Sequence, residues 1–327
     1  MHVLVTGAAG MLGRKLTESF SRIGGPGGRP IDALTLVDAV EPQAPPGLAG
    51  RTVARAADIA AAGVAEAMIA GRPDLVVHLA AIVSGEAEAD FDKGYRINLD
   101  ATRALFDAIR AANSADGYRP RLVFASSIAV FGAPFPDKIG DEFFTTPLTS
   151  YGTQKAIVEL LLADYSRRGF FDGIGLRLPT ICVRPGKPNT AASGFFSSIV
   201  REPLAGLEAV LPVGEDVRHW HASPRSAVGF LHHAAAMDLS ALGARRNLTM
   251  PGCSATVGDE IAALERVAGP KASALIRREP DPAIARIVAG WPCDFDARRA
   301  LALGFRAETS FDAIVRAHVE DELGGRI

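Results

Sequence analysis

The amino-acid sequence predicts an α/β fold, in which a doubly wound parallel sheet carries a smaller C-terminal lobe. Two observations predict the sheet: short apolar runs of strand length alternate with helical patterns, and a glycine-rich turn joins the first run to the first helix. A third observation predicts the lobe, because the alternation ends near residue 183 and gives way to a stretch rich in proline and small polar residues.

The predicted elements follow one another regularly along the first two-thirds of the chain. Strands are expected at 2–7, 34–38, 74–81, 121–127 and 173–183, and helices at 11–23, 95–112 and 151–168. Right-handed crossovers between such strands make a doubly wound sheet the default topology. A return strand is expected near 246–252, with further helices at 258–268 and 309–322. We therefore predict a sheet domain over 1–183, completed by the return strand, and a lobe over most of 184–327.

Composition narrows the class of protein and its compartment. The chain has 327 residues, of which 48% are apolar and 22% charged, and its net charge of -2 gives no general attraction to nucleic acid or anionic membranes. No apolar run reaches the roughly 18–20 residues of a membrane span. The three cysteines, Cys182, Cys253 and Cys293, lack CxxC spacing, which fits reduced thiols, and residues 1–12 lack a signal-peptide pattern. We expect a cytoplasmic protein with neither nucleic-acid nor membrane partners.

The stretch "VTGAAGMLGRKL" places Gly7, Gly10 and Gly13 between the first strand and a helix. Without Cβ atoms the backbone can turn tightly, and a pyrophosphate can approach the free N–H groups of the helix N-terminus. The spacing is GxxGxxG, so the strand–turn–helix context makes it informative rather than the bare string. Asp38 closes the second strand, where a carboxylate can accept both ribose hydroxyls and would repel a 2′-phosphate. This favours NAD over NADP, although Arg14 argues the other way.

The stretch "TSYGTQKAIVELLLADY" places Tyr151 and Lys155 one helical turn apart, so both side chains leave the same face. Removing hydride from a secondary alcohol requires a base for the hydroxyl proton, and tyrosine at its usual pKa of about 10 is a poor base at neutral pH. The Lys155 cation favours the phenolate, and a tyrosine pKa lower by roughly two to three would suit the reaction. Ser126 and Ser127 end the strand "RLVFASS", where a hydroxyl can donate to the substrate oxygen.

Taken in order, these motifs resemble the extended short-chain dehydrogenase/reductases. The GxxGxxG start, "HLAA" after a middle strand, the serine pair and the YxxxK motif match from residue 2 to about residue 185. The resemblance implies an NAD-binding Rossmann domain, with Tyr151, Lys155 and Ser127 as the catalytic residues. One departure is Phe131 in "AVFG", where many members carry tyrosine.

The same resemblance extends the set of predicted cofactor contacts. Asp58 and Ile59 are expected to flank the adenine, although an N-cap Asp would look the same. Asn98 is expected to hold the cofactor and the proton relay, with an exposed helix Asn as the alternative. The predicted cofactor-binding residues are Gly7, Gly10, Met11, Leu12, Gly13, Asp38, Asp58, Ile59, Leu79, Ala80, Ala81, Asn98, Ser126, Tyr151, Lys155 and Pro179.

Residues 176–204 are similar to sugar-acid dehydrogenases of this superfamily. The similarity implies NAD-dependent oxidation of a small sugar acid at its 2-hydroxyl, giving the 2-oxo acid. A small acid calls for an arginine fork at its carboxylate, and Arg184 and Arg218 are the candidates, with a surface salt bridge as the alternative for each. The predicted substrate-binding residues are Ser84, Ser126, Ser127, Tyr151, Thr180, Arg184, Ser193 and Arg218.

Two other functions remain open on the sequence. A sugar-nucleotide epimerase of the same superfamily would need a base-stacking aromatic, which Phe195 or Phe196 would supply unless the pair is core. An NAD-sensing protein without catalysis would have no need for Tyr151 and Lys155. A dehydratase is disfavoured because no acidic pair follows Ser127.

Two further expectations concern metals and assembly. His219 and His221 share one face of a predicted strand, but no third ligand is spaced to join them, so no metal is expected. The resemblance implies a homodimer that packs the helices near 95–112 and 151–168 against their copies.

Overall fold

The computed structural model describes residues 1–186 and 192–327, which form two compact units that interleave along the chain. The first unit contains Met1–Val130, Thr149–Arg177 and Val228–Leu248, and the second contains Phe131–Leu148, Leu178–Ala227 and Thr249–Ile327. The sequence predicts a sheet domain over 1–183 that is completed by a return strand near 246–252, and a lobe over most of 184–327. The chain instead passes between the units several times, because a strand within 131–148 pairs in the second unit while residues 228–248 return to the first.

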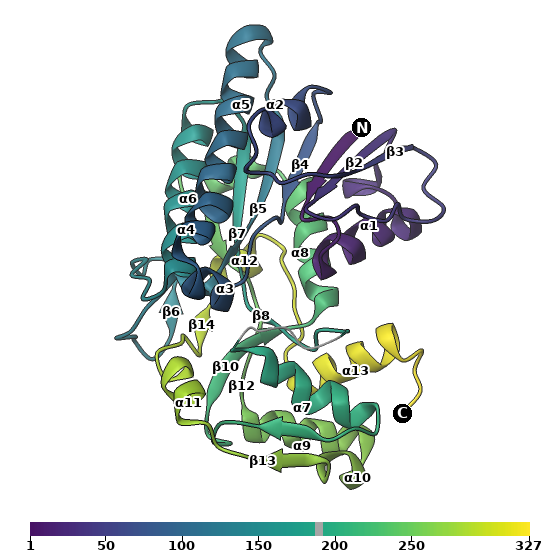
Figure 1. Ribbon diagram of the computed structural model, residues 1–327, viewed down its shortest axis with the longest axis vertical. Helices are drawn as coiled ribbons and strands as arrows, with labels where there is room; N and C mark the ends of the chain where they lie inside the picture. The colour runs from purple at the N-terminus through teal and green to yellow at the C-terminus, as the bar shows by residue number, and fades with distance from the viewer. Residues whose placement is uncertain (187–191) are drawn as a thin grey trace. The chain divides into compact units, whose positions relative to one another are not determined.

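The first unit is built on a seven-stranded sheet with the order β11-β7-β5-β4-β1-β2-β3 (Figure 1). Its strands are β1 (His2–Thr6), β2 (Ala33–Asp38), β3 (Arg51–Ala56), β4 (Leu75–His78), β5 (Arg121–Ser127), β7 (Asp172–Leu178) and β11 (Asn247–Thr249). The β1–β2, β2–β3, β1–β4 and β4–β5 pairings are parallel. The chain winds outward from β1 to β3 and then outward again from β4, which confirms the predicted doubly wound α/β fold.

Helices cover both faces of this sheet (Figure 1). On one face α2, α5 and α6 bury apolar side chains against it, among them Phe106 and Leu162. On the other face α1 meets α8, where the Phe20 and His232 rings lie edge to face at 5.2 Å. The helical segments are α1 (Met11–Ile23), η1 (Pro26–Gly28), α2 (Val64–Ile69), α3 (Ser84–Ala89), α4 (Phe91–Gly94), η2 (Tyr95–Asp100), α5 (Ala101–Asp116), η3 (Ile128–Val130), α6 (Ser150–Arg167), α8 (Pro224–Ala236) and η4 (Leu239–Leu242).

The second unit combines three small sheets with helices around a separate apolar core. Its sheets are β12-β10-β8, β13-β9 and β14-β6. The strands are β6 (Ile139–Gly140), β8 (Thr180–Ile181), β9 (Ala209–Leu211), β10 (Arg218–Ala222), β12 (Cys253–Thr256), β13 (Ile276–Arg278) and β14 (Phe295–Asp296). The helices are α7 (Gly194–Leu204), α9 (Val257–Ala268), α10 (Pro270–Ser273), α11 (Pro282–Val288), α12 (Arg298–Ala302) and α13 (Phe311–Glu322). Fully buried Phe196, Leu264 and Ile314 are central to the core.

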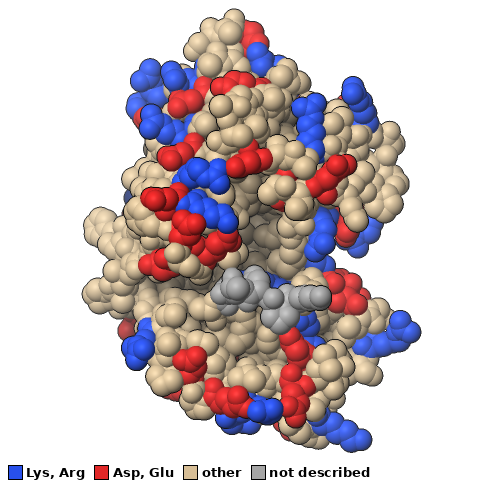
Figure 2. Space-filling model, in the orientation of Figure 1, with Lys and Arg blue, Asp and Glu red and all other residues tan. Residues whose placement is uncertain are grey.

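The surface carries charges of both signs. On the face drawn in Figure 2, lysine and arginine side chains are interspersed with aspartate and glutamate, in keeping with the net charge of -2. Across residues 1–186 and 192–327, none of the helices combines the length and the apolar character that crossing a membrane requires.

Candidate active site

The glycine turn after β1 is a close-packed cradle that only glycine can form. Gly7 has a φ of +71°, and a Cβ atom on it would lie 2.6 Å from the backbone nitrogen of Ala80. A Cβ atom on Gly13 would lie 2.4 Å from the carbonyl oxygen of Gly7. Gly10 is the N-cap of α1, so the first N–H groups of the helix open beside the turn. The backbone here leaves room for a pyrophosphate and offers it donors.

Asp38 is held beside this turn by backbone donors. Its Oδ2 atom accepts from the Ala9 nitrogen at 2.9 Å and its Oδ1 atom from the Ala39 nitrogen at 2.6 Å. The carboxylate therefore has a fixed orientation at the carboxyl end of β2, where a ribose would be read in this type of sheet. This is the position that the sequence predicts for it.

Asp58 and Ile59 have different environments although they are adjacent. Asp58 is exposed, accepts from Arg96 Nη1 at 2.7 Å and from the Ala60 nitrogen at 2.9 Å. The hydrogen bond from Arg96 is the main reason that the pKa of Asp58 is lowered. Ile59 is buried in the core of the first unit. Asp58 is thus oriented at the surface by Arg96, whereas Ile59 belongs to the core.

Tyr151 and Lys155 lie on one face of α6 at its N-terminal end. The helix is capped by Thr149, whose side chain accepts from the Gly152 nitrogen. Lys155 is 3% exposed, its Nζ atom lies 5.7 Å from the Tyr151 ring centroid, and it donates to the Ala125 carbonyl oxygen at 2.8 Å. Burial lowers the pKa of Lys155 to about 7, and the negative charge of Glu159 opposes that fall. The amine is therefore poised to gain or lose its proton near neutral pH.

The two serines at the end of β5 face opposite ways, as successive strand residues do. Ser126 is buried and its Oγ atom donates to Glu159 Oε1 at 2.6 Å. Ser127 is half-buried, and its Oγ atom accepts from the Ala129 nitrogen at 3.1 Å. The Ser126 proton is committed to Glu159, whereas the Ser127 hydroxyl can still donate. This arrangement favours Ser127 over Ser126 as a donor to a substrate oxygen.

Asn98 is bonded to the N-terminal part of α6, which also carries Tyr151 and Lys155. It lies in the π-helical segment η2 and is only 1% exposed, so the alternative of an exposed helix Asn is wrong. Its Nδ2 atom donates to Gln154 Oε1 at 2.7 Å, and its Oδ1 atom accepts from the Ile82 nitrogen at 2.9 Å. Asn98 thereby links the loop after β4 to α6 at Gln154, the residue that precedes Lys155.

His78, which is not among the residues predicted for the site, ends the buried run "LVVH" of β4. Its Nδ1 atom lies 2.7 Å from Thr6 Oγ1, and its Nε2 atom lies 2.9 Å from Thr102 Oγ1. Burial, assisted by the charge of Lys155, lowers the pKa of His78 to about 3, so the ring is neutral at physiological pH. A histidine ending an otherwise apolar strand just before "LAA" was the signal available in the sequence.

Several predicted residues of the first unit occupy the loops that border the cradle. Met11 and Leu12 open α1, Leu79, Ala80 and Ala81 directly follow β4, and Ser84 opens α3. The backbone after β4 packs against the glycine turn. For this reason the nearest atom to a Cβ atom on Gly7 would be the Ala80 nitrogen.

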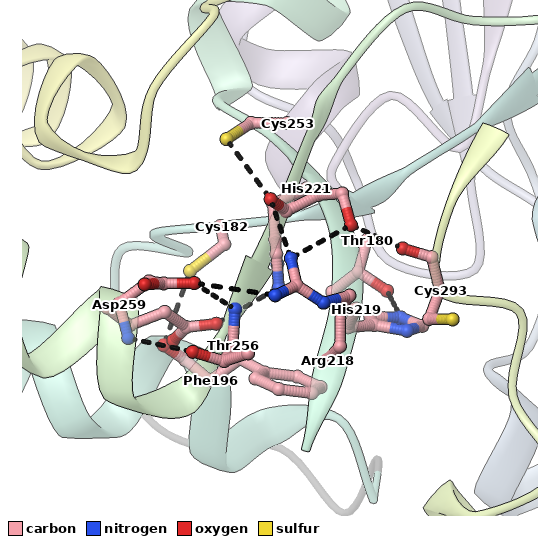
Figure 3. Close-up of polar contacts among 12 residues, drawn as sticks. Thr180, Cys182, Phe196, Arg218, His219, His221, Cys253, Thr256, Asp259 and Cys293 are labelled. Carbon is pink, nitrogen blue, oxygen red and sulfur yellow. Dashed lines mark hydrogen bonds and ion pairs between the residues drawn. The ribbon is translucent and has the colours of Figure 1, made fainter. Parts of the chain in front are cut away.

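The predicted substrate residues Thr180, Arg184, Ser193 and Arg218 all lie in the second unit, as does buried Pro179. Thr180 Oγ1 lies 2.7 Å from His219 Nε2 (Figure 3). Arg184 Nη2 donates to Ser193 Oγ at 3.3 Å, so those two are brought together. Arg218 is exposed and lies 4.0 Å from Asp259, which matches the surface salt bridge given as its alternative.

The aromatic and histidine pairs of the second unit belong to its interior. Phe195 and Phe196 are 7% and 0% exposed and are part of the core, so they are not available to stack on a base. His219 stacks on Phe196 with ring centroids 5.1 Å apart, and His221 lies 3.0 Å from Glu260, with both side chains fully buried. In the part of the chain that the structure describes, no three or more His, Cys, Asp or Glu side chains are arranged to hold a metal.

Comparison with known proteins identifies the family. The model of the NAD dependent epimerase/dehydratase family matches residues 3–243, which include the glycine turn, both serines, Tyr151 and Lys155. The chain belongs to this family. Its cofactor is NAD, for which the Gly7 cradle and the oriented Asp38 carboxylate provide a fitting site.

Relatives of this family member cover it almost end to end. It is 46% identical to D-erythronate dehydrogenase from Cupriavidus necator over 98% of each chain. It is 41% identical to D-erythronate dehydrogenase from Haemophilus influenzae over 99% of this chain and 100% of the relative. A solved structure of a nucleoside-diphosphate-sugar epimerase from Agrobacterium tumefaciens is 67% identical, covers 99% of this chain and 95% of its own, and gives a TM-score of 0.98. The family and these dehydrogenase relatives make the chain an NAD-dependent oxidoreductase.

Proposed function

We propose that the protein oxidises a small sugar acid at its 2-hydroxyl, and that the substrate is D-erythronate, giving 2-dehydro-D-erythronate. The observation that carries the proposal is the near full-length similarity to two D-erythronate dehydrogenases. The arrangement of Tyr151 and Lys155 supports it chemically, because oxidation of an alcohol needs a base and this pair supplies one.

Tyr151 is the base that takes the proton from the 2-hydroxyl. Lys155 favours the ionised phenol because its charge lies close to the ring, in a buried site where water screens it little. The Ala125 carbonyl fixes the position of the Lys155 amine. Ser127 donates a hydrogen bond to the substrate oxygen and holds it toward the phenol. NAD, when bound, supplies the acceptor for the hydride.

The substrate carboxylate is assigned to an arginine. Arg184 is the first candidate, because its guanidinium is already oriented by Ser193 and by the Ile181 carbonyl oxygen, which its Nε atom contacts at 3.1 Å. Arg218 is the second candidate, and Thr180 and Ser84 are the expected hydroxyl partners. We further expect the enzyme to act in the cytoplasm as a homodimer.

A second candidate function is NAD-dependent epimerisation of a sugar nucleotide. The name of the 67% identical structure from Agrobacterium tumefaciens favours it. The burial of Phe195 and Phe196 weighs against it, since the base-stacking aromatics expected for a nucleotide are in the core.

The two functions differ in whether NADH accumulates. Purified protein with NAD is offered four- to six-carbon sugar acids and, separately, UDP-sugars, and absorbance at 340 nm is followed. NADH formation on D-erythronate that falls by about 10²–10⁴ in Tyr151→Phe is the expected result. Conversion of a UDP-sugar without net NADH, together with no reaction on any acid, would replace the dehydrogenase by the epimerase.

A further inference from the structure

Glu159 lies one helical turn beyond Lys155 on α6, so Tyr151, Lys155 and Glu159 are aligned on one face. Its side chain is 2% exposed and its oxygens are fully engaged. Arg177 on β7 donates to it through Nε at 3.0 and 3.1 Å and through Nη2 at 2.7 Å, and Ser126 donates at 2.6 Å. These hydrogen bonds fix the Glu159 carboxylate in one orientation, one helical turn from Lys155.

Glu159 and Arg177 form a buried ion pair, with Arg177 Nη2 lying 2.7 Å from Glu159 Oε2. A guanidinium does not release its proton in proteins, and its planar fork matches both carboxylate oxygens. The two buried side chains are therefore held together as an ion pair. Glu159 is thus the negative member of that pair, on the face of α6 that carries Tyr151 and Lys155.

The effect of that charge falls on Lys155. Burial of the Lys155 ammonium favours the neutral amine. A neutral amine provides no electrostatic stabilisation for a phenolate. The Glu159 charge acts in the opposite direction and favours the ammonium. The helix spacing places Glu159 twice as far along α6 from Tyr151 as from Lys155, so its repulsion of a phenolate is the weaker effect.

We propose that Glu159 is a positioning residue that keeps Lys155 protonated and orients the end of β5 through Ser126. The proposal rests on the function proposed above, in which Lys155 must be a cation to support Tyr151. Because successive strand residues face opposite sides, fixing Ser126 on Glu159 also fixes the side on which the Ser127 hydroxyl lies.

The other groups near Lys155 do not titrate in the same range. From β4, His78 is neutral because its pKa is lowered to about 3. From β5, Lys155 meets the Phe124 ring at 4.7 Å and the Ala125 carbonyl, neither of which ionises. From α6 it lies 5.7 Å from the Tyr151 ring centroid and is influenced by the charge of Glu159. The pH profile near neutrality therefore reports the coupled Tyr151–Lys155 pair in the field of Glu159.

The test compares the pH profile of kcat for the wild type and Glu159→Gln. Activity requires an ionised Tyr151 and a protonated Lys155, so the basic limb reports loss of the Lys155 proton. We expect Glu159→Gln to move the basic limb to lower pH by about one pH unit and to lower kcat about tenfold at pH 8, with KM changed less than twofold. Asp164→Asn removes the same charge from an exposed position of α6 and should leave both limbs in place. A basic limb that does not move in Glu159→Gln would overturn the proposal and leave Glu159 a purely structural residue.

A double variant separates the effect of the lost Glu159 charge from the effect of misfolding. Glu159→Gln alone leaves Arg177 buried without its carboxylate, whereas Glu159→Gln with Arg177→Gln removes both charges together. The double variant should show the same direction of shift, and a wild-type basic limb in a folded double variant would equally overturn the proposal.

A readout without substrate separates this proposal from the proposed function. The Nζ resonance of ¹⁵N-labelled Lys155, assigned by its absence in Lys155→Met, is titrated in the wild type and in Glu159→Gln. We expect the midpoint to fall in the variant, whatever the substrate turns out to be. If no sugar acid is oxidised, the substrate assignment fails, while this titration still decides the role of Glu159. An unchanged midpoint would overturn that role.

Discussion

Each unit buries a glutamate almost completely, but the two glutamates have opposite partners. In the first unit Glu159 is held by the Arg177 guanidinium and by Ser126. In the second unit Glu260 lies 3.0 Å from His221, and burial raises the pKa of Glu260 well above its usual value while lowering that of His221 to about 3.

The difference teaches how the partner decides the charge of a buried acid. Arginine cannot become neutral, so an acid beside it stays ionised, and the pair provides a fixed field. Histidine can become neutral, so burial leaves an uncharged Glu260 beside an uncharged His221. The charged pair lies beside the part of α6 that carries Tyr151 and Lys155, and the neutral pair contacts the apolar core of the second unit through the rings of Phe196 and Phe311.

The largest expected effect is the loss of activity on removing the Lys155 charge. Lys155→Met removes the cation that the phenolate needs, so kcat/KM should fall by about 10²–10⁴ while the melting temperature holds or rises, since a buried amine is replaced by an apolar chain. Steady-state kinetics and a thermal melt measure both quantities. Activity within threefold of the wild type would show that Lys155 has no catalytic role.

The second effect is a difference in the free energy of unfolding between variants of the two glutamates. Glu159→Gln takes from the buried Arg177 guanidinium the carboxylate that pairs with it and should lower the free energy of unfolding by about 3–5 kcal/mol. Glu260→Gln replaces a neutral acid by a neutral amide and should change it by less than about 1 kcal/mol at pH 7. Urea unfolding measures both. Equal losses in the two variants would refute the distinction between a charged and a neutral pair.

The third effect is a pH dependence that the neutral pair conceals. The ordinary pKa values of the two groups are 4.5 for glutamate and 6.5 for histidine. At a pH between these values, folding adds a proton to Glu260 and removes one from His221. Their contributions to the pH dependence of stability therefore cancel. In Glu260→Gln only His221 remains, with a pKa depressed by folding, and its stabilisation is lost as pH falls below 6.5. Stability should drop by about 2 kcal/mol more between pH 7 and pH 5 in this variant than in the wild type. Parallel unfolding curves at the two pH values would contradict it.

The smallest effect provides the baseline for the others. Asp164 pairs with Arg167 at 2.5 Å, with side chains 57% and 65% exposed, so water screens the pair. Asp164→Asn should change the free energy of unfolding by less than about 0.5 kcal/mol. A loss near that of Glu159→Gln would mean that charge on α6 matters irrespective of burial.

Features set by neighbouring residues were predictable from the sequence. The turn at Gly7, the strand end at Asp38 and the shared face of Tyr151 and Lys155 each depend on a few consecutive residues. Their backbone geometry follows from glycine's missing Cβ atom, from strand length and from helical periodicity. The family resemblance rested on the same local motifs and was confirmed.

Features that join distant segments were not predictable. Arg177 reaches Glu159 from another strand, and β6 at residues 139–140 pairs with β14 at 295–296, which is why 131–148 belongs to the second unit. Periodicity marks Phe195 and Phe196 as apolar but does not distinguish a core pair from a base-stacking one. Only packing distinguishes them.

The sequence by itself determined the doubly wound sheet, the glycine cradle and the spacing of Tyr151 and Lys155, because local backbone preferences govern all three. The tertiary structure alone decided that Lys155 loses its water, that Ser126 turns to Glu159, and that Glu159 meets an arginine while Glu260 meets a histidine. The physical reason is that desolvation and charge pairing depend on what lies across a few ångströms of space, whichever part of the chain supplies it.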